Sequence, residues 1–139
     1  MEEDMEYGIP GHASKKGWAN RLQQWLKQRG VRFEAEGEAT RISLDSGLLV
    51  EIAESLEGDG YDIVMSIPLP GTGEEASSEE ALAPVRDAFE LAGMLGGELR
   101  YELDTSMPGY PVLRVMRGYR DPEEMVDALI AALDRLLSR

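Results

Sequence analysis

Residues 31–67, VRFEAEGEATRISLDSGLLVEIAESLEGDGYDIVMSI, decide the fold that we expect for this chain. Apolar and polar side chains alternate over 31–36, around 41–44 and over 61–67. Alternation with a period of two is the pattern of a strand with one buried face. Residues 48–53 are more continuously apolar, and they predict one further strand.

Turn signals separate these four runs. The triplet DSG at 45–47 and the tetrapeptide EGDG at 57–60 contain aspartate, serine and glycine. Such residues favour turns because glycine accepts a positive φ and the short polar side chains bond to nearby backbone. The stretch therefore predicts a four-stranded antiparallel meander with one buried face.

A helical pattern precedes the meander. Large apolar side chains recur at i, i+4, i+7 and i+8, which is one helical face: Trp18, Leu22, Trp25 and Leu26. Ser14 suits the N-cap position, and Gly30 suits the position just after the last turn. We predict a helix over about 15–29, after a flexible lead-in over residues 1–13. The tryptophans fit the core best, although they could instead form a ligand platform.

A second helix is predicted before the glycine pair at 96–97. Ser77 and Glu80 have the spacing of a capping box. Pro84 either belongs to the first turn of a helix that starts late or distorts the early turn. The core face of this helix is expected to carry Leu82, Val85, Phe89 and Ala92.

Two more strands and a third helix complete the pattern. Residues 98–103 alternate between charged and apolar side chains, and a strand is also expected over about 112–117. The peptide DPEE at 121–124 offers an N-cap aspartate, a proline at the first helical position and acids near the positive end of the helix dipole. It predicts a helix over about 122–137.

The predicted fold is a single α+β domain over residues 14–139. Its antiparallel sheet has about six strands, and it carries three helices in the order α-β-β-β-β-α-β-β-α. This order resembles the YbjN-like and type III secretion chaperone-like group of small α+β domains. The resemblance lies in the element order, in the helix end LGG at 95–97 before an alternating strand, and in the DPEE helix start.

The resemblance implies an adaptor, chaperone or regulatory module, often homodimeric. The small size and the pI of about 4.4 are similar to those of such chaperones. The proline- and glycine-rich segment at 68–77 departs from the pattern. No catalytic or ligand-binding residue of the family carries over to a position of this chain.

Reactive side chains are scarce. The 139 residues include one histidine, His12, and no cysteine. Imidazole and thiolate supply most nucleophile–base pairs and most transition-metal ligands. We therefore expect no catalytic residues, no cofactor and no metal site. The absence of cysteine favours the cytoplasm.

The formal net charge is −13, so the average surface repels nucleic acids and anionic membranes. We accordingly expect neither as a partner. A local basic patch is still conceivable, because Arg114, Arg117 and Arg120 lie close together in the sequence.

The second helix and one loop supply candidate contact residues. Leu91 and Met94 fall off the Leu82/Val85/Phe89 stripe at 100° per residue, and they are the candidates for homodimerisation, together with the strand at 98–103. Met107 and Tyr110 lie in the loop before the sixth strand, where they could form a second contact surface or fold against the sheet.

The function favoured by the sequence is a non-enzymatic protein- or peptide-binding module of chaperone, adaptor or regulatory type, with homodimerisation. The partner would bind the open sheet face or a sheet edge. The alternative is a small-molecule-binding domain or a carboxylate-dependent hydrolase between the sheet and the helices.

Overall fold

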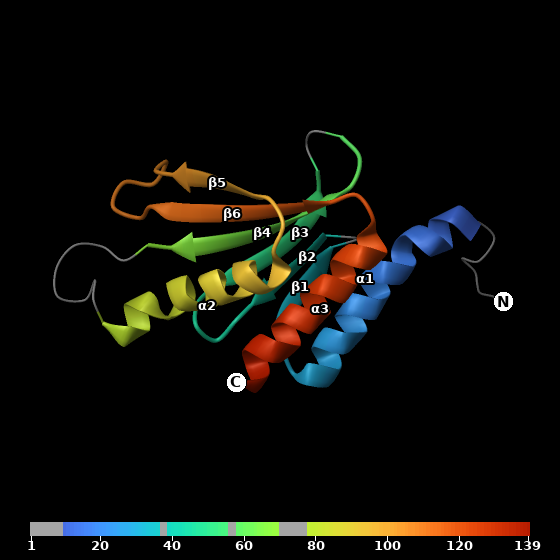
Figure 1. The fold of residues 1–139 in the computed structure, drawn as a ribbon, viewed down its shortest axis with the longest axis horizontal. Helices are drawn as coiled ribbons and strands as arrows, with labels where there is room; N and C mark the ends of the chain where they lie inside the picture. Colours follow the sequence, from blue (N-terminus) through green and yellow to red (C-terminus); the bar gives the residue numbers. More distant parts are fainter. Residues whose placement is uncertain (1–9, 37–38, 56–57, 70–77) are drawn as a thin grey trace.

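An antiparallel sheet of six strands with three helices on one face makes up the part of the chain that the computed structural model describes, residues 10–36, 39–55, 58–69 and 78–139 (Figure 1). In chain order the elements are α1 (Pro10–Arg29), β1 (Arg32–Glu36), β2 (Ala39–Ser43), β3 (Leu49–Glu54), β4 (Tyr61–Pro68), α2 (Glu79–Leu95), β5 (Leu99–Asp104), β6 (Val112–Tyr119) and α3 (Pro122–Ser138). The expected α+β fold, element order and antiparallel sheet are confirmed.

The strand order is β1-β2-β3-β4-β6-β5. The first four strands form the predicted meander, and the tight turn between β2 and β3 places Gly47 at φ +101°. The later pair then adds to the sheet through β6, which pairs with β4 over the whole length of both strands. As a result β5 pairs with β6 alone and is an edge of the sheet.

The core lies between the inner sheet face and the helices. Every second residue of β4 from Tyr61 to Ile67 is buried, whereas the residues between them are partly open. Trp18 of α1 is 1% exposed, and its ring lies edge-on to Tyr61 with 4.8 Å between ring centroids. Trp25 is half-buried against the same core. Trp18 therefore packs as a core residue, as predicted.

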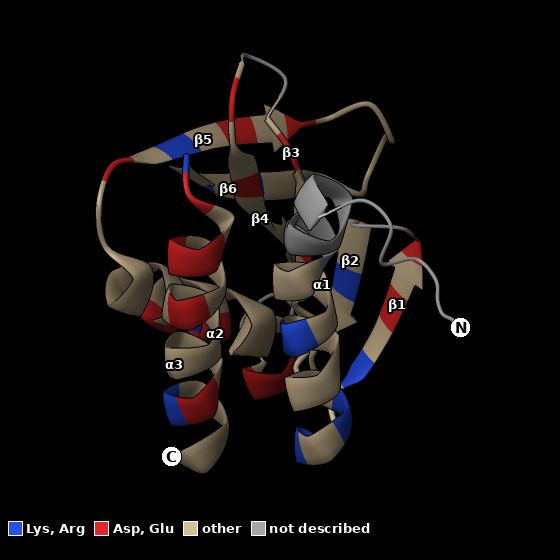
Figure 2. Cartoon of the chain, turned by 90° about the vertical axis from the view of Figure 1, so that its right-hand side faces the viewer, with Lys and Arg blue, Asp and Glu red and all other residues tan. Residues whose placement is uncertain are grey.

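The helices lie in the order α1, α3, α2 across the sheet, because α3 packs against both of the others. Figure 2 shows basic positions on α1 beside acidic positions on α3. Arg21 pairs with Glu123 and with Asp127, in each case at 2.9 Å, and hydrogen bonding to Glu123 is the main cause that raises the pKa of this guanidinium. These two helices are therefore joined by opposite charges above the core.

Two helix starts differ from the prediction. The backbone of α1 is helical from Pro10, so residues 10–13 of the expected lead-in belong to the helix and Ser14 lies inside it. For α2 the N-cap is Ser78, whose hydroxyl accepts a hydrogen bond from the Ala81 amide at 3.1 Å. Ser77 and most of the 68–77 segment lie outside the described residues.

The proline in α2 neither delays nor ends the helix, which runs from Glu79 through Pro84. The start of α3 is as predicted: Asp121 caps the helix through a 3.0 Å bond from the Glu123 amide, and Pro122 follows it at the first helical position. A side-chain cap and a pre-set φ therefore define where α3 begins.

Candidate functional site

Large apolar side chains are exposed at the β5 end of the sheet. Cross-strand register places Tyr101 opposite Val115 and Leu103 opposite Leu113. Val115 and Leu113 in turn lie opposite Met65 and Ile67, which are buried under the helices. Tyr101 and Leu103 therefore point to the helix-bearing face, yet they remain 62% and 57% exposed because no helix reaches that far.

In Figure 1, α2 is drawn below β4, whereas β6 and β5 lie above β4, on the side away from the helix. The helix contacts β4 and α3, and β4 is the only strand with which it makes an extensive contact among the described residues. β6 is partly covered, since it contacts α3 and its residues Val115 and Tyr119 are buried, whereas β5 makes no extensive contact with a helix among the described residues.

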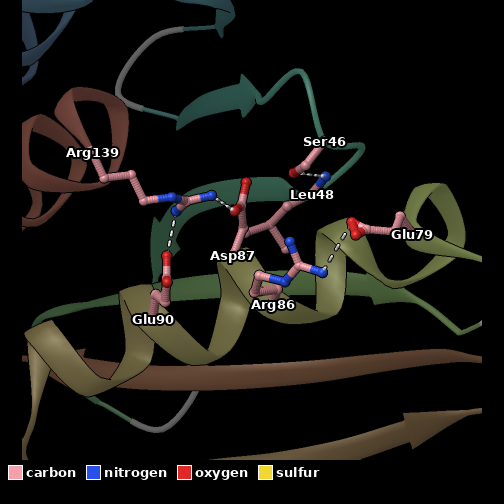
Figure 3. A network of polar contacts seen from close by, with 7 residues as sticks. All are labelled: Ser46, Leu48, Glu79, Arg86, Asp87, Glu90 and Arg139. Atoms are coloured by element: carbon pink, nitrogen blue, oxygen red, sulfur yellow. Dashed lines mark hydrogen bonds and ion pairs between the residues drawn. The ribbon is translucent and has the colours of Figure 1, made fainter.

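Ion pairs join one flank of α2 to the end of α3 (Figure 3). Arg139, at the end of α3, bonds to Asp87 at 2.8 Å and also to Glu90. Asp87 is one of the few buried charged residues, and the bond to its carboxylate is the main cause that raises the pKa of Arg139. In Figure 3 both acids point away from β6 and β5. This flank of α2 therefore faces α3.

The opposite flank of α2 faces the uncovered strands. At 100° per residue, Phe89 lies about 160° from Asp87 and about 100° from Glu90, whereas Leu82 lies about 140° from Asp87 and about 80° from Glu90, nearer the outer side of the helix. Leu82 is 36% exposed and Phe89 is 63% exposed. Val85 lies between them on this flank and is half-buried against the core. Phe89 and the apolar face of β5 are thus exposed on the same side of the sheet, with β6 between β5 and the strand that α2 contacts.

We call Leu82, Phe89, Tyr101 and Leu103 together the α2–β5 surface. All four lie on the helix-bearing side of the molecule, and they come from two elements that run in opposite directions (Figure 1). They make up four of the seven large apolar side chains that are exposed among the described residues. A cluster of exposed apolar side chains is more informative than single ones, because it marks an interaction surface or an aggregation hazard.

The loop between β5 and β6 adds two more exposed side chains at one end of this surface. Met107 is 64% exposed and Tyr110 is 71% exposed, so neither folds against the sheet. The loop itself is ordered by local bonds: the Tyr110 amide donates to the Met107 carbonyl at 3.0 Å, and Gly109 has φ +81°. Both candidate residues are thus presented outward from a defined turn.

Asp104 is the last residue of β5, directly before that loop. Its carboxylate accepts a 2.9 Å bond from the Ser106 amide and pairs with Arg114 at 3.0 Å. Hydrogen bonds from Ser106, with the bond to Arg114 as a smaller cause, lower the pKa of Asp104 to about 2. The carboxylate therefore stays charged across the physiological range and holds the start of the loop.

The other face of β5 is charged and is internally paired. Arg100 reaches across the sheet to Asp62 of β4 at 3.0 Å, and Glu102 lies 3.4 Å from Arg114. Gly118 of β6 lies opposite Asp62, and a side chain there would come within 3.1 Å of its carboxylate. The strand thus has one apolar and one charged face.

The three arginines near the chain end do not form one patch. Arg114 points to the open face, where it pairs with Glu102 and Asp104. Arg117 points to the helix-bearing face, where it donates to the Gly96 carbonyl at 2.8 Å and lies 4.1 Å from the centre of the Tyr119 ring. Arg114 and Arg117 are three positions apart on β6 and so face opposite sides, whereas Arg117 and Arg120 line the same hollow at this end of the sheet.

Several surface hollows could hold small molecules. One of these, about 440 Å³, lies where β4 and β5 begin and β6 ends, and includes Asp62, Arg100 and Arg117. Within the described ranges no three His, Cys, Asp or Glu side chains gather as metal ligands would. In the same ranges no helix combines the length and the hydropathy that spanning a bilayer requires.

The placement expected for two contact residues is wrong. Leu91 is 0% exposed and belongs to the core, and Met94 is half-buried against it. Phe89, which was expected in the core, is exposed instead. The face of α2 that packs inward is therefore rotated from the predicted one, toward Ala88 and Leu91. The loop residues Met107 and Tyr110 do lie on the surface.

Leu82 and Phe89 were expected in the core and were not identified as contact residues from the sequence, whereas Tyr101 and Leu103 belong to the strand at 98–103 that the sequence analysis named as a candidate contact. The alternating pattern of β5 predicts one apolar face, and such a face stays exposed where the strand lies at an uncovered edge of the sheet. Whether a strand ends up at an edge depends on long-range pairing, and the sequence pattern does not contain that information.

No protein family, curated protein or solved structure matches this chain.

Proposed function

We propose that this chain is a non-enzymatic protein- or peptide-binding module of chaperone, adaptor or regulatory type that acts in the cytoplasm. The partner binds the α2–β5 surface, with Met107 and Tyr110 at one end of it. The resemblance to type III secretion chaperone-like domains, and a homodimeric state, are parts of the same proposal.

One observation carries the proposal: two separate elements expose large apolar side chains on the same side of the molecule. Phe89 and Tyr101 are each more than 60% exposed. Aromatic side chains contribute much contact area with few rotatable bonds, which suits them to be anchors of an interface. The unpaired edge of β5 adds backbone donors and acceptors next to these anchors.

The edge and the apolar side chains together fit an extended peptide. A strand that pairs with β5 would place every second side chain on the helix-bearing face, beside Tyr101 and Leu103. Main-chain hydrogen bonds would then supply affinity, and the α2–β5 surface would select apolar side chains at alternate positions. A folded partner could present the same features through an edge strand of its own.

A random peptide library displayed on phage tests this proposal. The immobilised chain is expected to enrich peptides in which apolar residues alternate with others, and Phe89→Ser or Tyr101→Ser should abolish the enrichment. Leu137→Ser is the matched control, because Leu137 is 40% exposed on α3, away from this surface. Absence of enrichment, or enrichment that survives both variants, would contradict the proposal.

A further inference from the structure

The two edges of the sheet differ in what they expose. β1 has five residues, of which Arg32, Glu34 and Glu36 are charged, and α1 packs against it. β5 has six residues and carries exposed apolar side chains on its helix-bearing face. Natural proteins usually protect an exposed apolar edge by charge, proline, a bulge or a covering element. β5 also carries three charged residues, Arg100, Glu102 and Asp104, but these lie on its other face. Because it has no proline and, unlike β1, no extensive contact with a helix in the described part of the chain, it is the edge that is suited to pairing.

We infer that β5 pairs with β5 of a second copy of this chain, antiparallel and centred on Tyr101. The inference rests on the proposed function, because it names the partner that binds the α2–β5 surface. The two sheets would then join into one continuous antiparallel sheet, related by a twofold axis perpendicular to it.

The sequence of β5 selects this register. A twofold axis perpendicular to the sheet leaves each side chain on the same face of the joined sheet. Residues that face each other across the seam must therefore differ by an even number of positions, so one residue of β5 faces its own copy at the axis. Centring on Tyr101 places Arg100 opposite Glu102 of the second copy, and Leu99 opposite Leu103 of the second copy. Opposite charges and apolar pairs at directly facing positions are both favourable. The strand is therefore complementary to itself.

The neighbouring registers are less favourable. Centring on Arg100 or on Glu102 places that residue opposite its own copy, so like charges meet. Centring on Leu103 places Glu102 opposite Asp104, with the same result. Centring on Leu99 moves Tyr101 opposite Gly97, which lies before the strand begins. Facing like charges destabilise a strand pair.

The same axis brings the two α2 helices to one side of the joined sheet. Tyr101 and Leu103 of each copy then line the seam on that side and are covered by the second copy, whereas β6 and β5 separate each α2 from the seam. Arg100 keeps its bond to Asp62, because that bond runs inward over the sheet and Glu102 of the second copy approaches from the edge.

Engineered cysteines test the register without interference, because the chain has no cysteine of its own. Facing Cβ atoms on paired strands lie about 4.5–5.5 Å apart, within reach of a disulfide or a short thiol crosslinker. Tyr101→Cys is expected to crosslink to its own copy. Leu103→Cys should crosslink only when it is mixed with Leu99→Cys, and Glu34→Cys on the other edge should not crosslink.

Charge reversal supplies a second test. Arg100→Glu and Glu102→Arg are each expected to weaken self-association about tenfold, since every facing pair becomes a like-charge pair. An equimolar mixture of the two variants restores complementary pairs and should form heterodimers of nearly wild-type affinity. Sedimentation equilibrium measures both effects, and circular dichroism verifies that each variant is folded.

The results separate this inference from the proposed function. Self-crosslinking at Tyr101→Cys and recovery in the charge-reversal mixture support it. A monomeric chain at high concentration, crosslinks at Glu34→Cys, or a mixture that stays monomeric would overturn it. If the monomer still selects peptides through Phe89, only the second copy is refuted, whereas loss of both activities refutes the proposed function as well.

Discussion

Leu91→Ala and Phe89→Ala should have very different effects on stability, although the two residues are two positions apart on one helix. Leu91 is 0% exposed, and removal of a core leucine side chain typically costs about 2–5 kcal/mol, including the cavity that remains. A fully buried phenylalanine would cost about 3–5 kcal/mol, but only about a third of Phe89 is covered, so roughly 1–2 kcal/mol is expected.

Helix propensity further lowers the cost expected for Phe89→Ala. Alanine is a better helix former than phenylalanine by about 0.5 kcal/mol, which offsets part of the lost contact in Phe89→Ala. Leucine and alanine differ less in this respect, so the cost of Leu91→Ala stays near that of the cavity. We expect the free energy of unfolding to fall at least twice as far for Leu91→Ala.

Urea denaturation followed by far-UV circular dichroism measures the difference. It is best performed at low protein concentration, where self-association adds least to the apparent stability. The m value should not change in either variant, because the surface exposed on unfolding is nearly the same. A loss for Phe89→Ala equal to or larger than that for Leu91→Ala would refute the orientation of α2 described above.

Three further predictions concern Asp104, Gly97 and Tyr119. The pKa of Asp104 is lowered to about 2 from 3.8, so the carboxylate stabilises the fold fully above pH 4, and this effect is lost as the pH falls toward 2. The free energies of unfolding of wild type and Asp104→Asn, measured by urea titration, should therefore differ at pH 7 and converge near pH 2. Gly97 has φ +73°, and a Cβ there would lie 2.4 Å from the guanidinium of Arg117, so Gly97→Ala should cost more than the ~1 kcal/mol of left-handed strain alone. Equal thermal shifts for Gly97→Ala and Gly30→Ala, where φ is +78° and the added Cβ meets nothing within 4 Å, would contradict this. The hydroxyl of Tyr119 is buried without a hydrogen-bond partner among the described residues, and burial raises its pKa; Tyr119→Phe should therefore unfold at equal or higher urea concentration, with a gain of up to about 1 kcal/mol, and a clear loss would show that the hydroxyl has a partner.

Local pattern was sufficient for the strands of the meander and for the last helix. Alternation over 61–67 correctly predicted which side chains of β4 are buried, since pleat geometry sends neighbours to opposite faces. The DPEE peptide at 121–124 predicted the start of α3 to the residue, because capping chemistry depends only on atoms within the first turn. Such features need no information from distant parts of the chain.

The inward face of α2 could not be predicted in the same way. This helix has two apolar stripes, one through Leu82 and Phe89 and one through Ala88 and Leu91. Asp87 lies beside the second stripe, and a charged side chain is rarely buried unless it is paired. Its carboxylate is paired with Arg139, which is 52 positions away in the chain. A distant cation thus makes the burial of this face possible, and no local periodicity shows it.

The amino-acid sequence by itself determined the elements of this protein, their order and the faces of its central strands, because side-chain periodicity and caps act between neighbours in the chain. Only the tertiary structure decided that β6 inserts between β4 and β5, and that α2 covers β4 without reaching the edge. Those two outcomes depend on contacts between segments far apart in sequence, and together they expose the apolar face of β5 on which the proposed function rests.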